Sequence, residues 1–473
     1  MDILFCSVPG TMSYTPVLAP ALLKACAIRA GFSSTGIDLN AEIYARIARD
    51  PNYKSIEKFF KLQEIDPVIK DTIGDLIEYC GNKILSYNAK IIGLSLLTQD
   101  SQFFCLWLCH YIKTVNPDAK ILIGGSGIKA YIAESDVSFA EILKTHGLIN
   151  DYIYGDGEYA VVAYLKNNLS FPGINSNQWE PIKELNELPY ADFDDYDLSK
   201  YDPPVIPICD SRGCVRTCEF CDIIEHWKKY QYRTADNIFA EMVYQLEKYN
   251  ITRFTFYNSL TNGNMKEFGK LLDLICDYND THERTMSWIG YFIVRNSRQH
   301  PEAMWEKIKK SNGGLILGIE SVVEPVRIQL GKNFKNEDID YHLDMAKQYE
   351  VPLLLLLIIG YPTETKRDFE YTKQWFIDRQ EKINSIPNLT VMATIAAILP
   401  NTGLDRKQKE YGIVKGEVPT VWMTPVNAIS TKERIEYLNE FLALLTELKI
   451  PVSHGNENTL EVAEQEYSNF TRL

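Results

Sequence analysis

Residues 212–222 read Arg-Gly-Cys-Val-Arg-Thr-Cys-Glu-Phe-Cys-Asp and place three cysteines, Cys214, Cys218 and Cys221, in one short stretch. Their spacing is C-x3-C-x2-C, and Phe220 directly precedes the last cysteine. Three thiolates on one loop hold three irons of a cubane cluster, whereas an electron-transfer cluster of this type normally takes four cysteine ligands. The fourth iron is then free to bind a small molecule. The stretch therefore predicts a 4Fe-4S cluster with an open coordination position.

A zinc site is the alternative for these cysteines, with Cys209 or His226 as the fourth ligand. Structural zinc usually shows paired C-x2-4-C or H-x3-5-H spacings, and the chain has no second pair of this kind near the loop. Cys209 ends an apolar run at 204–208 and is better interpreted as a buried strand residue. The spacing therefore favours the iron–sulfur cluster over zinc.

Composition excludes several classes of function. The chain has 473 residues, enough for two or three domains, and a net charge of −14. Such an acidic balance argues against a general nucleic-acid or anionic-membrane surface. The longest apolar run, 351–360, is too short to cross a bilayer. The ten cysteines show no disulfide framework and the first residues show no secretory pattern, so we expect a cytoplasmic protein.

The first 172 residues alternate short apolar runs with helical periods, which predicts a Rossmann-like parallel sheet wrapped by helices. We expect strands at 2–8, 34–39, 91–96, 120–123 and 152–154, and helices near 18–30, 56–87 and 103–113. In such sheets ligands bind at the carboxyl ends of the strands. The candidate binding residues there are Ser95, Thr98, Gly124 and Gly125.

A polar, proline-punctuated linker is expected at 173–204, and βα units follow it over 205–403. With the strand before the cysteines, the expected strands at 253–257, 286–294, 314–317, 352–359 and 389–399 make six. Six βα repeats fit a partial TIM-like barrel with its site on the C-terminal face. The remaining residues, 404–473, carry an amphipathic helix near 431–448 and are expected to form a small helical cap.

The cysteine stretch and the order of the strand-end motifs from about 207 to 403 resemble the radical S-adenosylmethionine (SAM) superfamily. The resemblance implies that the open iron chelates the amino and carboxylate groups of SAM. It further implies that the reduced cluster cleaves SAM to a 5′-deoxyadenosyl radical. An electron donor such as flavodoxin or ferredoxin is then the expected partner.

The resemblance also assigns roles to residues at the strand ends. Phe220 is expected under the adenine of SAM, and Ile358, Ile359 and Gly360 match the fifth-strand turn that packs on it. Glu320 and Ser321 match a Gly-Ile-Glu-Ser motif that faces the ribose and the methionyl carboxylate.

The second and third strand ends match the family pattern less closely. Asn258 and Ser259 occupy the second-strand position, where relatives commonly carry Gly-Gly-Glu or an Asp-containing turn that holds the methionyl amine, so this chain departs from the usual pattern. Arg295, at the mouth of the third strand, is interpreted as a ligand of the SAM carboxylate or of an anionic substrate, or as part of a structural ion pair.

The N-terminal segment resembles the Rossmann-like cobalamin-binding domain found upstream of many radical SAM domains. The matching stretches are 92–98, 123–125 and 155–158. The D-x-H-x-x-G signature, which supplies an axial histidine in some cobalamin proteins, is absent. Cobalamin is therefore the expected cofactor of this domain, without a histidine ligand, and an empty scaffold is the alternative.

Together these features predict a radical SAM enzyme that methylates an unactivated carbon of a small-molecule or peptide substrate with the help of cobalamin. A radical cyclisation, oxidation or rearrangement is the alternative if no cobalamin binds. A sensor that binds cofactor without turnover is a third hypothesis, and the complete set of SAM-binding motifs speaks against it. Formation of 5′-deoxyadenosine from SAM separates the enzymes from the sensor.

Overall fold

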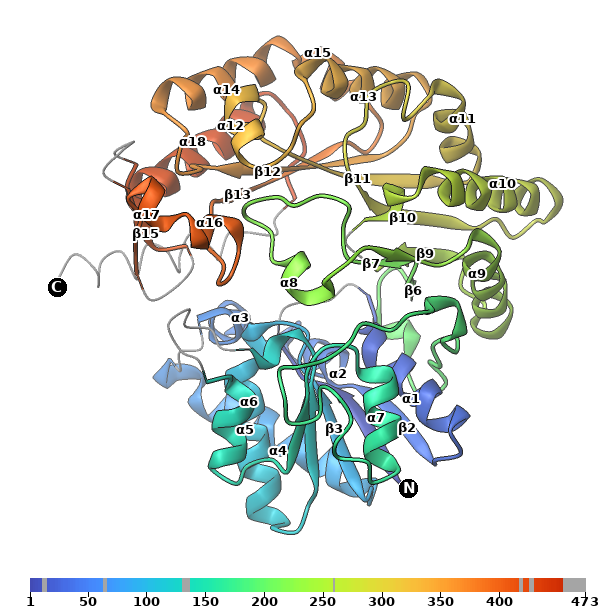
Figure 1. Cartoon of the computed structure of the whole chain (residues 1–473). Coiled ribbons are helices and arrows are strands. Elements are labelled where there is room, and N and C mark those ends of the chain that lie inside the picture. The colour runs from blue at the N-terminus through green and yellow to red at the C-terminus, as the bar shows by residue number, and fades with distance from the viewer. Residues whose placement is uncertain are drawn as a thin grey trace. The chain divides into compact units, whose positions relative to one another are not determined.

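Five short apolar runs form the parallel sheet predicted for the first half of the chain. The strands are β1 (Ile3–Ser7), β2 (Ser34–Asp38), β3 (Ile91–Ser95), β4 (Ile121–Gly124) and β5 (Asp151–Ile153), in the order β2-β1-β3-β4-β5. Each neighbouring pair is parallel. The sheet is buried by helices on both faces, which explains why its strands read as continuous apolar runs and not as alternating ones (Figure 1).

The structure is a computed structural model and describes residues 1–10, 15–62, 66–129, 137–257, 260–416, 420–424 and 429–453. The chain divides into two units, Met1–Pro207 and Ile208–Leu473. In the first unit the helices are α1 (Leu18–Arg29), α2 (Leu39–Ile47), α3 (Tyr53–Leu62), α4 (Lys70–Ser86), α5 (Gln102–Val115), α6 (Phe139–Thr145) and α7 (Gly157–Leu165). Among the described residues, no helix combines the length and the apolar character needed to cross a membrane.

The helical stretch expected over 56–87 contains two helices in the structure, α3 and α4. A short 3-10 turn, Pro67–Ile69, precedes α4, and the Asp66 carboxylate accepts a hydrogen bond from the Val68 amide at 2.9 Å. Pro67 has no amide hydrogen to donate to a preceding turn, and its ring would clash with that turn. The proline therefore begins a new helical segment.

The segment predicted as a linker packs on the first unit. The buried Lys24 ammonium of α1 lies 3.0 Å from the Asp192 carboxylate, and the Gly36 amide of β2 donates to Asp195 at 3.1 Å. Trp179 and Phe193 are buried as well. Residues 173–204 thus contribute side chains to the core of this unit.

A second sheet carries six strands in the order β13-β12-β11-β10-β9-β6, which confirms the predicted barrel-like βα architecture. Its strands are β6 (Ile206–Ile208), β9 (Arg253–Phe256), β10 (Ser287–Phe292), β11 (Gly313–Glu320), β12 (Leu353–Ile359) and β13 (Thr390–Ile395). The pairs from β9 to β13 are parallel. The carboxyl ends of these strands therefore meet at one edge of the sheet.

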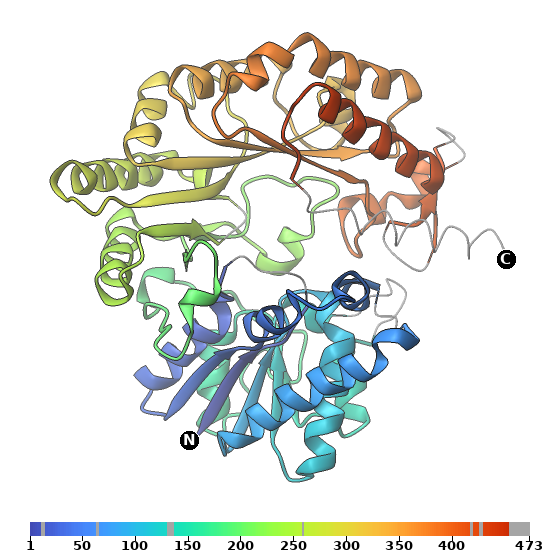
Figure 2. The same ribbon diagram turned by 180° about the vertical axis from the view of Figure 1, so that it is seen from behind.

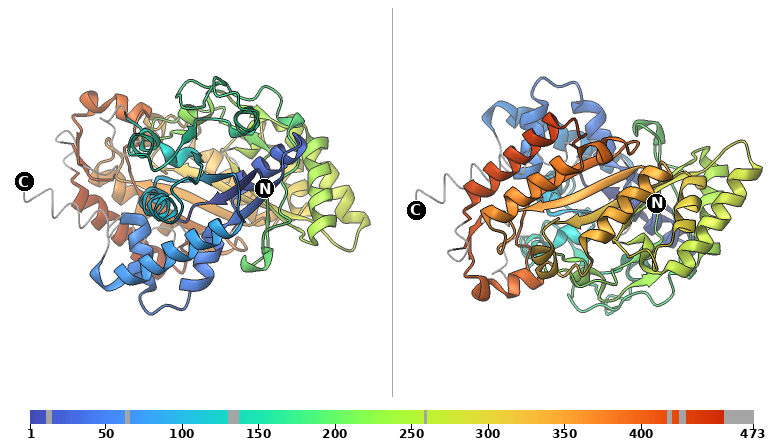
Figure 3. Two further views of the ribbon diagram at one scale, coloured as in Figure 1. Left: turned by 90° about the horizontal axis from the view of Figure 1, so that it is seen from below. Right: turned by 90° about the horizontal axis from the view of Figure 1, so that it is seen from above.

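Helices cover one face of this sheet, and the cysteine loop lies at the other (Figure 1 and Figure 2). They are α9 (Ala235–Tyr249), α10 (Met265–Thr281), α11 (Glu302–Lys310), α12 (Glu324–Gln329), α13 (Asn336–Gln348), α14 (Lys366–Asp378), α15 (Gln380–Asn384) and α18 (Thr431–Glu447). Seen from above in Figure 3, several of these helices lie over the strands. Strand residues alternate between the two faces, so every second residue in β10, β12 and β13 is buried under helices.

The helix expected near 431–448 is α18, and it lies against α14, with Tyr437 stacked on Phe369 at a ring separation of 4.3 Å. It therefore joins the layer of helices outside the sheet. The elements before it are short: α16 (Gly403–Arg406), α17 (Gln408–Tyr411) and the ribbon of β14 (Val414–Lys415) with β15 (Trp422–Met423).

Candidate active site

The cysteine loop begins at a small antiparallel ribbon. Strand β7 (Ser211–Arg212) pairs with β8 (Gln231–Tyr232), and helix α8 (Ile223–Trp227) lies between them in the chain. Gly213 has φ 77°, and a side chain there would collide with the carbonyl group of Lys229. Only glycine adopts this conformation without strain, so Gly213 turns the chain into the loop that carries the three cysteines.

The far end of the loop is tied to two other elements of the same unit. The amide of Glu219 donates to the Leu330 carbonyl at 3.0 Å, and its own carbonyl accepts from the Leu404 amide at 2.7 Å. The Glu219 carboxylate pairs with Lys407 at 3.0 Å. Because these contacts come from the chain after α12 and from α16, the backbone around Cys218 is held before any ligand binds.

The thiols of Cys214, Cys218 and Cys221 are half-buried on this loop. Burial raises the pKa of Cys221 to about 12, and burial also raises the pKa of Cys218 against the opposing charge of Lys332. Metal binding takes cysteine as thiolate, so iron must displace these protons. Three thiols on one ordered, partly open loop fit the three protein ligands of a site-differentiated 4Fe-4S cluster.

Among the described residues, no three His, Cys, Asp or Glu side chains converge as ligands of one metal ion would. A cubane does not require such convergence, because each thiolate binds a different iron of the cluster.

Glu320 ends β11 in an unusual backbone conformation. Its φ is 58°, in the left-handed region that non-glycine residues seldom adopt, and the pairing of β11 with β12 shifts register between Gly318 and Glu320. Only 7% of the residue is exposed. Strained backbone of this kind persists where surrounding contacts enforce it and is concentrated at functional sites. The bulge directs the carboxylate into the site.

Lys332 is a site residue that the sequence analysis missed. Its ammonium donates to the Glu320 carboxylate and to the Gly318 carbonyl, each at 2.7 Å, and lies 5.9 Å from the centre of the Phe220 ring. Burial lowers the pKa of Lys332, but the charges of Glu320 and Cys218 outweigh it and raise the pKa above its ordinary value. The ammonium is therefore charged and holds Glu320 beside the cysteine loop.

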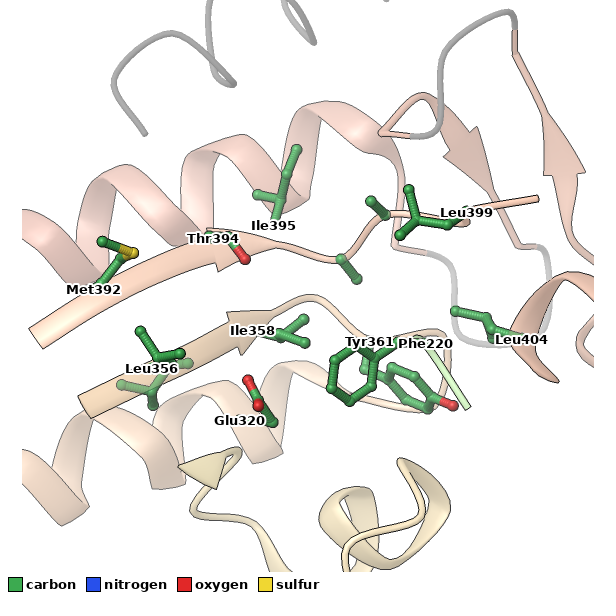
Figure 4. Close-up of a pocket in the computed structure, with 13 residues that line it drawn as sticks. Phe220, Glu320, Leu356, Ile358, Tyr361, Met392, Thr394, Ile395, Leu399 and Leu404 are labelled. Atoms are coloured by element: carbon green, nitrogen blue, oxygen red, sulfur yellow. The ribbon is translucent and has the colours of Figure 1, made fainter. Parts of the chain in front are cut away.

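A cavity of about 290 Å³ lies beside this pair (Figure 4). It is lined mainly by apolar side chains, and it brings together three of the predicted regions: Phe220 from the cysteine loop, Glu320 from β11 and Ile358 from β12. Of the two isoleucines predicted for this turn, Ile358 lines the cavity, and Ile359 is 1% exposed on the alternate face of β12. An apolar cavity with one charged pair at its wall suits a purine ring and its polar substituents.

Gly360 and Ser321 shape the turns around the cavity. Gly360 has φ 77° and its amide donates to the Glu364 carboxylate, as does the amide of Tyr361 at 3.2 Å. Ser321 is buried, and its hydroxyl accepts from the Val323 amide at 3.1 Å. These hydrogen bonds fix the backbone of the two turns. Tyr361 contributes its ring to the cavity.

Arg295 follows β10 and bonds to backbone. Its guanidinium donates to the carbonyl of Asn262 at 2.9 Å and to that of Gly263 at 3.3 Å. Burial and the nearby Arg216 lower its pKa. Asn258 and Ser259, predicted for the second strand end, lie outside the described residues.

The four candidate residues of the first unit lie at the carboxyl edge of its sheet. Ser95 ends β3 and Gly124 ends β4, and the Leu96 amide donates to the Gly124 carbonyl at 2.9 Å. Gly125 has φ 97°, and a side chain there would collide with the Leu96 carbonyl. Thr98 begins the turn before α5. This edge is therefore built from small residues with closely spaced backbone, which fits a large flat ligand that approaches the main chain.

The buried Glu364 makes the stability of the protein depend on pH. Burial raises the pKa of Glu364 to about 7, against the two amides that bind it. The folded chain thus keeps, up to about pH 7, a proton that the unfolded chain releases near pH 4.5. The free energy of unfolding therefore falls as pH rises from about 4.5 to about 7 and is level above that. We expect Glu364→Gln to remove this loss, so that its stability relative to the wild type rises by on the order of 3 kcal/mol between pH 4.5 and pH 8.

Urea unfolding at several pH values measures this effect. Glu337→Gln, which removes an exposed carboxylate in the first turn of α13, is the matched control. Wild type and Glu364→Gln with parallel pH profiles would contradict the assignment.

Comparison with known proteins identifies the domain that carries this site. Residues 208–376 match the radical SAM superfamily. An uncharacterised methyltransferase from Pyrococcus horikoshii is 22% identical over 373 residues, which cover 73% of this chain and 74% of that protein.

Two solved structures share the fold over nearly the whole chain. The radical SAM methyltransferase TsrM from Kitasatospora setae, with cobalamin and a 4Fe-4S cluster bound, has a TM-score of 0.67 at 13% identity and covers 97% of this chain and 92% of its own. The cobalamin-dependent SAM radical enzyme OxsB, with aqua-cobalamin bound, has a TM-score of 0.67 at 13% identity. The match covers 93% of this chain and 66% of the OxsB chain. Residues 208–376 therefore form a radical SAM domain, and the chain is a radical SAM enzyme that uses a 4Fe-4S cluster and SAM.

Proposed function

We propose that this enzyme is a cobalamin-dependent radical SAM methyltransferase that modifies an unactivated carbon of a small-molecule or peptide substrate. The observation that carries the proposal is the grouping of Phe220, Glu320 and Ile358 around one cavity beside the three-cysteine loop. The fold shared with TsrM and OxsB across both units supports the methyltransferase assignment.

The residues of the second unit bind and orient SAM in this proposal. Cys214, Cys218 and Cys221 would hold the cluster, which, when bound, would supply the electron for the reductive cleavage of SAM. Phe220 and Ile358 enclose the adenine in the apolar cavity, where water is excluded. Glu320, held by Lys332, accepts hydrogen bonds from the ribose hydroxyls or the methionyl ammonium.

The first unit holds cobalamin in this proposal, at the carboxyl edge formed by Ser95, Thr98, Gly124 and Gly125. When bound, cobalamin supplies the methyl group that the substrate carbon receives. The small side chains at this edge let the backbone approach the corrin and the nucleotide tail. Because radical SAM cleavage consumes an electron, a reduced flavodoxin or ferredoxin is the proposed partner, in the cytoplasm.

Two assays test the reaction. The anaerobically reconstituted protein, reduced with titanium citrate, should convert SAM to 5′-deoxyadenosine, and a deuterated methyl group of SAM should appear on bound cobalamin. Cleavage of SAM without methyl transfer to cobalamin would assign the chain to a radical cyclisation, oxidation or rearrangement. Tight binding of SAM without any cleavage would overturn the enzymatic proposal.

Cobalamin should bind without a histidine ligand from the protein. The described histidines of the first unit, His110 and His146, lie within α5 and at the end of α6, away from the carboxyl ends of the strands. We therefore expect electron paramagnetic resonance of the cob(II)alamin-loaded protein to show no nitrogen splitting from a protein imidazole. A split signal that persists with cobinamide, which lacks the nucleotide base, would contradict this, as would a failure to bind any corrinoid at micromolar concentration.

A further inference from the structure

A second cavity, of about 460 Å³, lies within the first unit. The residues that line it all come from the stretch 156–187, and none of them belongs to the edge proposed for cobalamin. Part of its wall is the proline-punctuated segment that the sequence analysis predicted to be a linker. The volume is that of a pocket for a small molecule, so this segment and the turn after β5 together form a candidate binding site.

The apolar side of the second cavity is built around Trp179, which is 9% exposed. Its ring lies against the backbone of Gly155, where φ is 74° and a side chain would come within 2.0 Å of the ring. Only glycine accepts both this backbone conformation and this close approach, so the fold fixes the position of the indole. Tyr159 of α7 and Phe171 bring two more aromatic rings to the same cavity.

Hydrogen bonds to the backbone hold the wall of the second cavity in place. The Tyr154 amide donates to the Gly173 carbonyl at 2.9 Å, and the Ile182 amide donates to the Asp156 carboxylate at 2.6 Å. These bonds tie the stretch 171–182 to the turn after β5. The cavity is therefore a feature of the folded chain and needs no ligand to form.

Negative charge gathers around the three rings. Four of the residues that line the cavity are carboxylates, whereas Lys183 is the one cation among the described residues of its wall. Glu180, Glu184 and Glu187 are exposed, and none of their carboxylates forms an ion pair with another described residue. Burial and the charge of Glu187 raise the pKa of Tyr159, so this carboxylate lies close to the phenol. The cavity thus combines aromatic rings with uncompensated negative charge.

This combination selects an organic cation. The face of an aromatic ring carries negative partial charge and attracts an ammonium or guanidinium group, while the ring also buries the apolar part of such a ligand. The carboxylates attract the same positive charge and repel an anion. A bare metal ion does not fit, because no three His, Cys, Asp or Glu side chains converge as its ligands in the part of the chain that the structure describes.

We propose that the second cavity binds a small organic cation, whose charged group lies between the rings of Trp179 and Tyr159 and the glutamates around them. The site belongs to the first unit alone and is separate from the edge proposed for cobalamin. It therefore adds a ligand to the protein and does not depend on the proposed function.

Three probes of one shape and different charge test the class of ligand. Choline is a cation, 3,3-dimethylbutan-1-ol is its neutral analogue with carbon in place of nitrogen, and 3,3-dimethylbutanoate is an anion. Saturation-transfer NMR on the cluster-loaded full chain should show that choline binds about tenfold more tightly than the other two. Equal affinities for choline and the neutral alcohol, or no binding of choline, would overturn the proposal.

Two triple variants locate the site. Glu180→Gln/Glu184→Gln/Glu187→Gln removes three exposed charges from the cavity and should weaken choline binding about tenfold, while the neutral alcohol keeps its affinity. Glu247→Gln/Glu283→Gln/Glu337→Gln removes three exposed charges from the second unit and should leave choline binding unchanged. The same loss in both variants would overturn the location, because it would reflect the net charge of the chain alone.

Tyr159→Leu tests the role of the ring. Leucine keeps an apolar wall without the aromatic face, so choline should bind several-fold more weakly and the neutral alcohol should be unaffected. Equal losses for both probes would overturn the placement of the positive charge against this ring.

Competition with hydroxocobalamin tests whether the site is separate. Saturating hydroxocobalamin should leave the affinity for choline unchanged. Displacement of choline would overturn the proposal of a separate site, since the cavity would then belong to the corrinoid. Failure to form 5′-deoxyadenosine would remove the proposed function and leave the order of the three probes as it is.

Discussion

Alanine at Cys214, Cys218 or Cys221 will abolish cluster assembly and with it all SAM cleavage. The intact protein, reconstituted without oxygen, should bind about four irons and four sulfides per chain, as one cubane requires. Loss of any one thiolate leaves two, and two ligands on a half-exposed loop do not retain a cluster against solvent. Iron and sulfide analysis and the charge-transfer absorption measure this directly, and 5′-deoxyadenosine formation should fall below detection.

Two other cysteines serve as matched controls. Cys209 follows β6, where its thiol donates to the Ser211 carbonyl at 3.8 Å, and Cys276 lies in α10. Both are buried, at 7% and 8% exposure. Cys209→Ala and Cys276→Ala should retain the full iron content. Stoichiometric zinc without charge-transfer absorption in protein isolated without oxygen would instead support the zinc site.

Local patterns in the sequence predicted most of the fold. Each strand of the first sheet lies within two residues of its expected position, because buried parallel strands are short apolar runs bounded by glycine and polar residues. The expected strand at 286–294 is β10 at Ser287–Phe292 for the same reason. The break between α3 and α4 could also have been found, since Asp66-Pro67 is a helix-start signal within an otherwise helical period.

Residues that act through long-range contacts were harder to predict. Lys332 follows Leu330-Gly331 after the short helix α12. No local pattern in that stretch predicts that its ammonium bonds to Glu320. The one local signal was Gly331, whose φ of 85° marks a turn and where a side chain would meet the backbone of Thr217 and Cys218. The role of Glu364 was equally hidden, because its pKa is set by burial, which the sequence does not display.

The two faces of β10 were also hard to assign from the sequence. Alternation in β10 was visible in Ser-Trp-Ile-Gly-Tyr-Phe, but both faces of that strand are apolar. Only the packing of Trp288 under α10 shows which face the helices cover and which one stays open.

Lys332→Met is expected to have the largest effect on stability. The substitution removes the ammonium and leaves the Glu320 carboxylate, 7% exposed, without its partner at 2.7 Å. Removing one member of a buried ion pair costs about 3–5 kcal/mol, because the remaining charge is desolvated and unpaired. Urea unfolding measures the loss, and Lys309→Met, which breaks an exposed pair with Glu350, should cost less than about 1 kcal/mol.

The double variant Lys332→Met/Glu320→Gln separates stability from SAM binding. With both charges removed, most of the lost stability should return, so the two changes will not be additive. Affinity for SAM should not return with it. Glu320→Gln alone should already weaken SAM binding by about 1–3 kcal/mol, the cost of an unmatched buried hydrogen-bonding group. Recovery of both properties in the double variant would show that the pair only supports the fold, and additive losses of stability would show that the two side chains do not interact.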